Sequence, residues 1–279
     1  MSADVLSVFD LEALDEALAG TTFQGRVTHL RSVGSTNQVA LEAAQAGARA
    51  GVWIADEQTA GRGRGGHTWH SAAGEGLYLS VLTVPRVPLA LAFKIPLAVG
   101  LAAQAAVLAV IGLVCDLRWP NDLMFGEKKF GGILVESVSE PFTDASASHA
   151  EAHGPRLRYA VIGIGINVNH AVFPAELHAL ATSLAIEGHR ILAREALVAA
   201  LLEHLQVELE GLKKDGDGHR GIVRRFTAAS SWVWGKRVRV EEGGGYTGCT
   251  AGLNADGFLL VNSDDGVCRT VYSGGVRSA

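Results

Sequence analysis

The sequence predicts an α+β fold, in which a mixed β-sheet packs with helices and a small β-barrel follows at the C-terminus. Two observations lead to this prediction. Segments with the spacing of strands and of helices interleave over residues 1–228. After Ser231 this pattern stops, and short strands alternate with turn residues. We therefore expect two domains, residues 1–228 and residues 229–279.

Apolar spacing and capping residues predict the elements in order. Leucines at helical spacing follow Asp10, and Ser35 or Thr36 precedes a helical segment that Gly47 ends. We expect helices at 11–18, 36–47, 95–114 and 194–212 and a helical turn at 222–226. We expect strands at 27–30, 52–55, 77–84, 113–118, 132–138 and 159–168, then at 237–241, 246–251, 257–261 and 269–272. Residues 139–155 lack periodicity, which predicts an exposed, mobile loop.

The segment at residues 95–114 is long enough to cross a membrane, and Gln104 is its only strongly polar side chain. Much of it is alanine and glycine, which gain little from lipid, and Pro96 stands where a helix would start. We therefore predict a helix buried in the core of a soluble protein, and no membrane partner.

Charge and cysteine content narrow the class of protein. The formal net charge is −5, whereas nucleic-acid binders usually carry a basic field. The three cysteines form no CxxC pair, which favours reduced thiols in buried or half-buried positions. The N-terminus lacks the pattern of a signal peptide. We expect a cytoplasmic protein.

Two motifs combine small polar residues, glycine and arginine. Ser35, Thr36 and Asn37 stand at a helix start, where free backbone N–H groups can hold a polar ligand, although an ordinary helix cap has the same composition. Residues 58–66 are Q-T-A-G-R-G-R-G-G. Their glycines let the backbone approach a ligand, and the arginines suit carboxylate and phosphate oxygens. A mobile surface loop or a nucleic-acid-binding segment stays open as an alternative.

Two further motifs lie at predicted strands. In Trp119-Pro120-Asn121-Asp122 a stiff aromatic–proline pair presents polar side chains, and a plain hairpin turn is the alternative. Lys128 and Lys129 follow, and because strand side chains alternate, only one of them can face a given cleft. The segment 163–169 is G-I-G-I-N-V-N, in which Asn167 offers the donor and acceptor that adenine recognition needs.

Taken together, the motifs resemble those of biotin–protein ligases. That family carries S-T-N, G-R-G-R-x-G, K/R-W-P-N-D, K-x-x-G-I-L-x-E and G-x-G-I-N-x in this order. The chain has Ser35-Thr36-Asn37, residues 61–66, residues 118–122, residues 129–136 and residues 163–167. The resemblance extends from about residue 20 to the C-terminal barrel. It implies a class II synthetase-like catalytic domain with an SH3-like C-terminal barrel.

The resemblance also implies a reaction and a set of roles. Biotin would be activated by ATP, with Mg²⁺, to biotinyl-5′-AMP and transferred to a lysine of a biotin carboxyl carrier domain. Lys129, Arg62 and Arg64 would be catalytic. The residues implied to bind biotin are Ser35, Thr36, Asn37, Gln58, Arg62, Gly63, Arg64 and Lys129. Those implied to bind ATP or the adenylate are Trp69, Arg118, Asn121, Asp122 and Asn167, with Asp122 as a Mg²⁺ contact and residues 170–191 as surrounding walls.

The chain departs from the family pattern at Gly65, where relatives often have a second arginine, and at Ala72, where a proline is common. Many relatives also carry an N-terminal helix-turn-helix. Because few residues precede Ser35, we expect no repressor function and no DNA partner. The resemblance allows a homodimer.

Three alternatives remain beside this interpretation. A lipoate or octanoate ligase would share the fold and chemistry, but its own arginine- and glycine-rich signature is absent. A non-enzymatic RNA-binding module is opposed by the net charge. A biotin-sensing regulator would need the DNA-binding domain.

Overall fold

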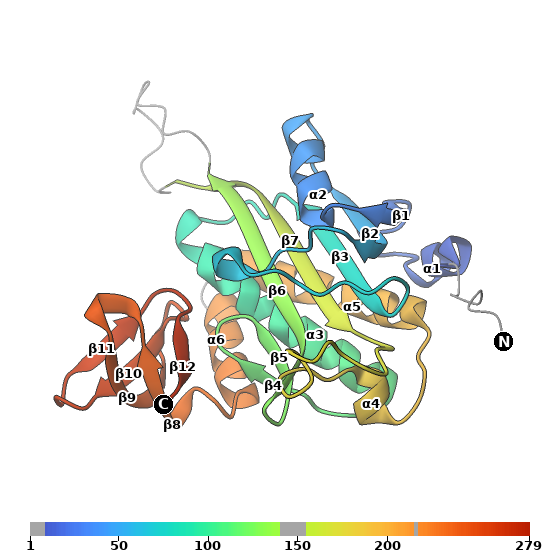
Figure 1. The fold of residues 1–279 in the computed structure, drawn as a ribbon. Helices are drawn as coiled ribbons and strands as arrows, with labels where there is room; N and C mark the ends of the chain where they lie inside the picture. Colours follow the sequence, from blue (N-terminus) through green and yellow to red (C-terminus); the bar gives the residue numbers. More distant parts are fainter. Residues whose placement is uncertain (1–8, 140–154, 215–216) are drawn as a thin grey trace, which may run out of the picture.

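The computed structural model describes residues 9–139, 155–214 and 217–279. A seven-stranded sheet forms the larger part, in the order β1-β2-β3-β7-β6-β5-β4 (Figure 1). β1 and β2 pair in parallel, and every other neighbouring pair in this sheet is antiparallel. The strands are β1 Val27–Val33, β2 Gly51–Gln58, β3 Gly76–Thr83, β4 Asp116–Arg118, β5 Asp122–Phe125, β6 Lys128–Ser139 and β7 Leu157–Asn167.

Helices cover the two faces of this sheet unequally. α3 (Ile95–Ile111), α5 (Arg194–Lys213) and α6 (Asp217–Ala229) pack together, with α3 and α5 against the sheet. α2 (Thr36–Gln45) packs on β2, β3 and β7. Because strand side chains alternate, Leu79 and Val81 of β3 join the main core, while Leu82 packs with Ala40 of α2. The short α1 (Leu11–Ala17) and α4 (Leu184–Gly188) lie at the periphery of the sheet (Figure 1).

The apolar helix lies in the core, as the sequence predicted. The helical segment Leu89–Ile111, which includes the 3₁₀ turn before α3, has the length and hydropathy of a membrane span, but its side chains are mostly buried inside the protein. α3 ends at Ile111 rather than at residue 114, because Gly112 adopts φ +75° as a left-handed cap. The next strand accordingly begins at Asp116 instead of residue 113.

The C-terminal part is a five-stranded antiparallel sheet in the order β11-β10-β9-β8-β12. Its strands are β8 Trp234–Val240, β9 Tyr246–Leu253, β10 Leu259–Ser263, β11 Cys268–Val271 and β12 Val276–Ser278. It is fixed to the larger part by the indole of Trp119, which donates to the carbonyl of Gly257 at 2.9 Å. Asp116 also accepts from the backbone N–H and hydroxyl of Ser231.

The α+β class with a small C-terminal β-domain is therefore confirmed, with corrections of detail. The sequence did not predict β5, α4 or β12, and α6 is a helix of 13 residues instead of the turn expected at 222–226. Cys115 is buried as expected, whereas Cys249 and Cys268 are exposed. Most of the loop expected at 139–155 lies outside the described residues, and the division at 228/229, within the last turn of α6, stays a prediction.

Candidate active site

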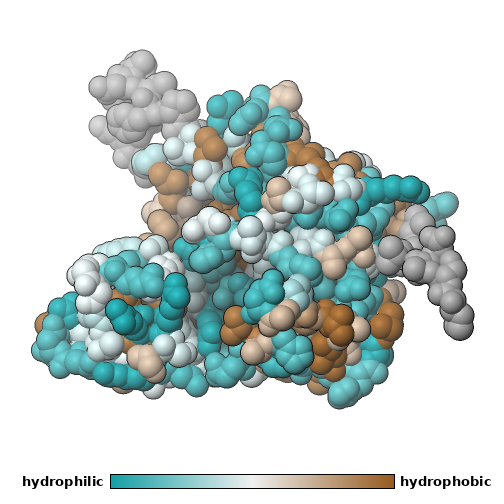
Figure 2. Space-filling model, in the orientation of Figure 1, coloured by the Kyte–Doolittle hydropathy of each residue, from teal (hydrophilic) through white to brown (hydrophobic). Residues whose placement is uncertain are grey.

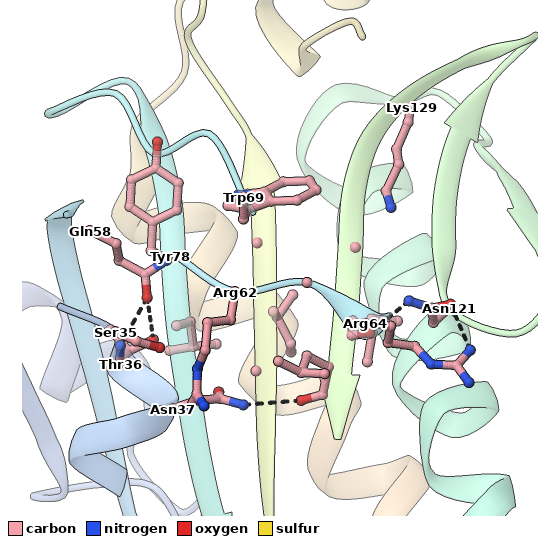
Figure 3. A pocket seen from close by; sticks show the side chains of 18 residues that line it. Ser35, Thr36, Asn37, Gln58, Arg62, Arg64, Trp69, Tyr78, Asn121 and Lys129 are labelled. Atoms are coloured by element: carbon pink, nitrogen blue, oxygen red, sulfur yellow. Dashed lines mark hydrogen bonds between the residues drawn. The ribbon is translucent and has the colours of Figure 1, made fainter. Parts of the chain in front are cut away.

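A pocket opens on the α2 side of the large sheet, over β3, β7 and β6 (Figure 3). The loop after β2 crosses the sheet here, and the space-filling view shows mainly hydrophilic and pale residues along this part of the face (Figures 1 and 2). The pocket brings together ten of the thirteen residues to which the sequence assigned binding or catalytic roles: Ser35, Thr36, Asn37, Gln58, Arg62, Gly63, Arg64, Trp69, Asn121 and Lys129.

The floor of the pocket is made of strand glycines. Gly163 and Gly165 alternate along β7, and Gly132 on β6 pairs with Gly165. A Cβ at Gly163 would lie 2.3 Å from Oδ1 of Asn37, and one at Gly165 would lie 2.7 Å from the indole of Trp69. These glycines are therefore required by close approach of side chains above the sheet.

A chain of hydrogen bonds lines the wall beside α2. The carboxamide oxygen of Gln58 accepts from the backbone N–H and hydroxyl of Thr36, at 2.8 and 3.1 Å. The hydroxyl of Ser80 lies 2.7 Å from that of Thr36 and 2.6 Å from Oδ1 of Asn37. Since Ser80 has one proton and Asn37 directs its amide at Glu136, Ser80 donates to Asn37. Ser35 also lines the pocket, and its side chain makes no capping hydrogen bond to α2.

The two loop arginines reach in different directions from the loop (Figure 3). Nη2 of Arg62 lies 3.5 Å from the Glu136 carboxylate. Arg64 donates to Oδ1 of Asn121 at 3.2 Å. Burial lowers the pKa of Arg64, and the nearby carboxylates of Asp122 and Glu242 oppose this shift, so the guanidinium stays charged.

Lys129 enters the pocket, while its neighbour Lys128 is exposed, in agreement with the alternation expected on a strand. Its ammonium donates to Oδ1 of Asp122 at 2.6 Å and lies 5.5 Å from the ring centroid of Trp69. Its backbone N–H donates to the carbonyl of Leu180, and its carbonyl accepts from the N–H of Thr182. The segment after β7 thus fixes the backbone of Lys129.

Three predicted site residues do not line the pocket. Asp122 instead forms an ion pair with Lys129. Asn167 is buried and donates to the carbonyl of Thr182 at 3.0 Å, so it is one hydrogen bond away from the backbone of Lys129. Arg118 points away, toward Glu127 and the ring of Trp232.

Sequence reasoning missed three residues that build the site. Tyr78 lines the pocket, and its hydroxyl donates to the carbonyl of Ala72 at 2.9 Å. Ala72 lies in the segment that joins the arginine loop, residues 61–66, to β3. Ser80 is buried two positions after Tyr78 on the same strand, and Glu136 accepts from Asn37 at 2.8 Å. Period-two alternation along residues 77–83 would have placed Tyr78 and Ser80 on the face opposite the leucine core.

Comparisons with known proteins show which family has this sequence and fold. The model of the biotin/lipoate A/B protein ligase family matches residues 30–149, and that of the biotin protein ligase C-terminal domain matches residues 233–276. The bifunctional ligase/repressor BirA of Bacillus spizizenii is 32% identical over 252 residues, covering 88% of this chain and 71% of that protein. The biotin–[acetyl-CoA-carboxylase] ligase of Mycobacterium tuberculosis is 34% identical, covering 76% of this chain and 73% of its own length.

The chain belongs to the biotin–protein ligase family. Solved biotin–protein ligases are similar over nearly the whole chain. The Aquifex aeolicus biotin–protein ligase, in complex with biotin and ATP, matches with a TM-score of 0.72 at 27% identity, covering 91% of this chain and 98% of that one. The Leishmania major biotin–protein ligase, in complex with biotinyl-5-AMP, matches with a TM-score of 0.57 at 25% identity, covering 89% and 99%.

Proposed function

We propose that this chain activates biotin with ATP to biotinyl-5′-AMP and transfers the biotinyl group to a lysine of a biotin carboxyl carrier domain. The observation that carries the proposal is the convergence of Arg62, Arg64 and Lys129 on one pocket with a glycine floor. The names of the relatives, which specify biotin and acetyl-CoA carboxylase, support the substrate and the carrier. They also leave the lipoate ligase alternative with less support.

The chemistry requires this concentration of positive charge. A carboxylate that attacks the α-phosphate of ATP brings two anions together, and fixed cations lower the cost of that approach. We assign Lys129 to the forming acyl–phosphate group and the loop arginines to the carboxylate and phosphate oxygens. Ser35, Thr36, Asn37 and Gln58 would hold the biotin rings, and the loop of residues 61–66 would keep water from the mixed anhydride.

We infer that Mg²⁺ accompanies the nucleotide. Mg²⁺ is commonly held by one or two carboxylates together with substrate phosphates, and it would neutralise phosphate charge. Asp122 fits such a limited contact, because its Oδ1 is taken by Lys129 and leaves one carboxylate oxygen. The described residues contain no group of three His, Cys, Asp or Glu that could hold the ion alone. Asn121 and Asn167 are proposed for the nucleotide side, Asn167 through the segment that it positions.

The cytoplasmic location, the absence of DNA and membrane partners and the homodimer stay predictions. Mass spectrometry of the chain mixed with biotin, ATP and Mg²⁺ tests the reaction itself. We expect the acyl-adenylate of biotin, and a mixture with lipoate in place of biotin is the control. An adenylate formed from lipoate and not from biotin would reject the proposal in favour of the alternative ligase.

Lys129 gives the sharpest single-residue test of this function. We expect Lys129→Ala to lower the rate of biotin-dependent pyrophosphate release by about 10²–10³, the usual effect of removing one transition-state donor. Lys128→Ala is the matched control, since Lys128 is the exposed neighbour on the same strand. Circular dichroism should show both variants folded. A wild-type rate in Lys129→Ala would remove the lysine from the mechanism.

A further inference from the structure

A carboxylate of the protein lies beside the pocket that is proposed to bind an acid, in an adjoining hollow that Arg62 also lines. Glu136 lies on β6, and its side chain is 30% exposed. Its Oε2 accepts from Nδ2 of Asn37 at 2.8 Å and lies 3.5 Å from Nη2 of Arg62. One carboxylate oxygen therefore holds both an amide that belongs to the ring-binding wall and a guanidinium that belongs to the closing loop.

A partly exposed carboxylate in this place affects the binding of an anionic substrate. Biotin enters with a negative charge, which Arg62 is proposed to meet. The guanidinium has a limited number of donors on each edge, and in this structure one edge faces Glu136. A substrate carboxylate must therefore compete with Glu136 for Arg62.

We propose that Glu136 is a positioning residue that acts as an internal counter-anion: it holds Arg62 in the cleft until the acid group of the substrate takes its place. The inference rests on the proposed function. The same oxygen accepts from Asn37, so one carboxylate of Glu136 contacts both the wall beside α2 and the arginine loop. The loop is thereby kept over the pocket at the cost of part of the affinity for the free acid.

Glu136→Gln separates the two roles of this side chain. Glutamine keeps an oxygen that can accept from Asn37 but removes the charge that Arg62 faces. We expect the variant to bind biotin about two- to fivefold more tightly than the wild type in isothermal titration calorimetry without ATP, a range set by the strength of a partly exposed ion pair. A purely structural role for Glu136 would weaken binding, so the sign of the change decides.

Three controls complete the experiment. Biotinamide, which lacks the negative charge, should bind equally to the wild type and to Glu136→Gln. In an Arg62→Ala background the substitution should bring no gain. Glu127→Gln, which removes the carboxylate from an exposed pair with Arg118, should leave biotin affinity unchanged.

The change in biotin affinity decides between the possible roles of Glu136. A gain for biotin alone that depends on Arg62 supports the proposal, and it should shrink at 0.5 M salt because the groups are partly exposed. Equal or weaker binding of biotin by Glu136→Gln overturns it. A gain that persists without Arg62 also overturns it, because Glu136 would then repel the substrate directly. If the wild-type chain binds no biotin, the proposed function itself fails, and that result is distinct from all of these.

Discussion

The floor of the pocket and the turns of the C-terminal sheet both depend on glycine, but for different physical reasons. Gly163 and Gly165 have ordinary strand conformations, and side chains occupy the space where a Cβ would stand. Gly243 and Gly266 have positive φ, +65° and +84°, and a Cβ there would meet nothing within 4 Å. In the first region glycine makes room for other groups, and in the second it provides backbone freedom.

The difference teaches where a glycine indicates function. A glycine required by φ belongs to a turn, and its side chain position faces open space. A glycine required by close approach in the middle of a strand indicates that something else must lie on the sheet. At Gly163, Gly165 and Gly132 the neighbouring side chains are those of Asn37, Trp69 and Lys129, and each of them lines the pocket.

Gly163→Ala should have the largest effect of the substitutions that test this comparison. The added methyl would displace Asn37, whose amide holds Glu136 and whose oxygen accepts from Ser80. Losing buried hydrogen bonds of this kind costs about 1–3 kcal/mol. We expect biotin affinity to fall about tenfold or more in isothermal titration calorimetry, with a smaller loss of thermal stability. Unchanged affinity would mean that Asn37 is not part of the binding wall.

The length over which a periodic pattern extends explains how much of the fold the sequence could predict. The apolar helix, the amphipathic helix α5 and most strands of the large sheet follow from local spacing, which the chain carries over many residues. The short β12 and the five-residue α4 carry too little periodicity to be recognised. The site motifs could be recognised one by one, since each is a continuous run of residues.

What the sequence could not predict is which of those residues contact each other. Glu136 and Asn37 lie 99 positions apart and meet only because β6, β7 and β3 pair in the order observed. Arg118 adjoins the Trp-Pro motif, yet its side chain turns to the C-terminal domain. Pairing across a sheet depends on tertiary packing rather than on the spacing along one segment.

His170 allows a test of how burial in the larger domain affects stability. Among the described residues, both ring nitrogens of His170 and the indole nitrogen of Trp69 are buried without a hydrogen-bond partner. Burial, with a smaller contribution from His70, lowers the pKa of His170 to about 4. The folded state therefore favours the neutral ring, which stacks on Phe173.

The sign of the pH dependence follows from this shift. The unfolded chain takes up a proton near pH 6.5, whereas the folded chain does so only near pH 4. Stability from this group is thus fully present above pH 6.5 and is lost as the pH falls to 4, by about 1–3 kcal/mol. His170→Met should flatten the urea-unfolding free energy between pH 7.5 and 4.5. His178→Gln, at an exposed position on the same segment, should follow the wild type.

Gly266→Ala should have the smallest effect, and it tests the other side of the comparison. Gly266 lies in the turn between β10 and β11, where alanine must adopt φ +84° without any steric contact. A left-handed residue of this kind costs about 1 kcal/mol, which corresponds to a fall in Tm of roughly 2–4 °C for a chain of this size. Biotin affinity should be unchanged, because no atom of the pocket moves. A loss of affinity equal to that of Gly163→Ala would show that the two kinds of glycine are not distinct, since the turns of the C-terminal sheet would then be coupled to the pocket floor.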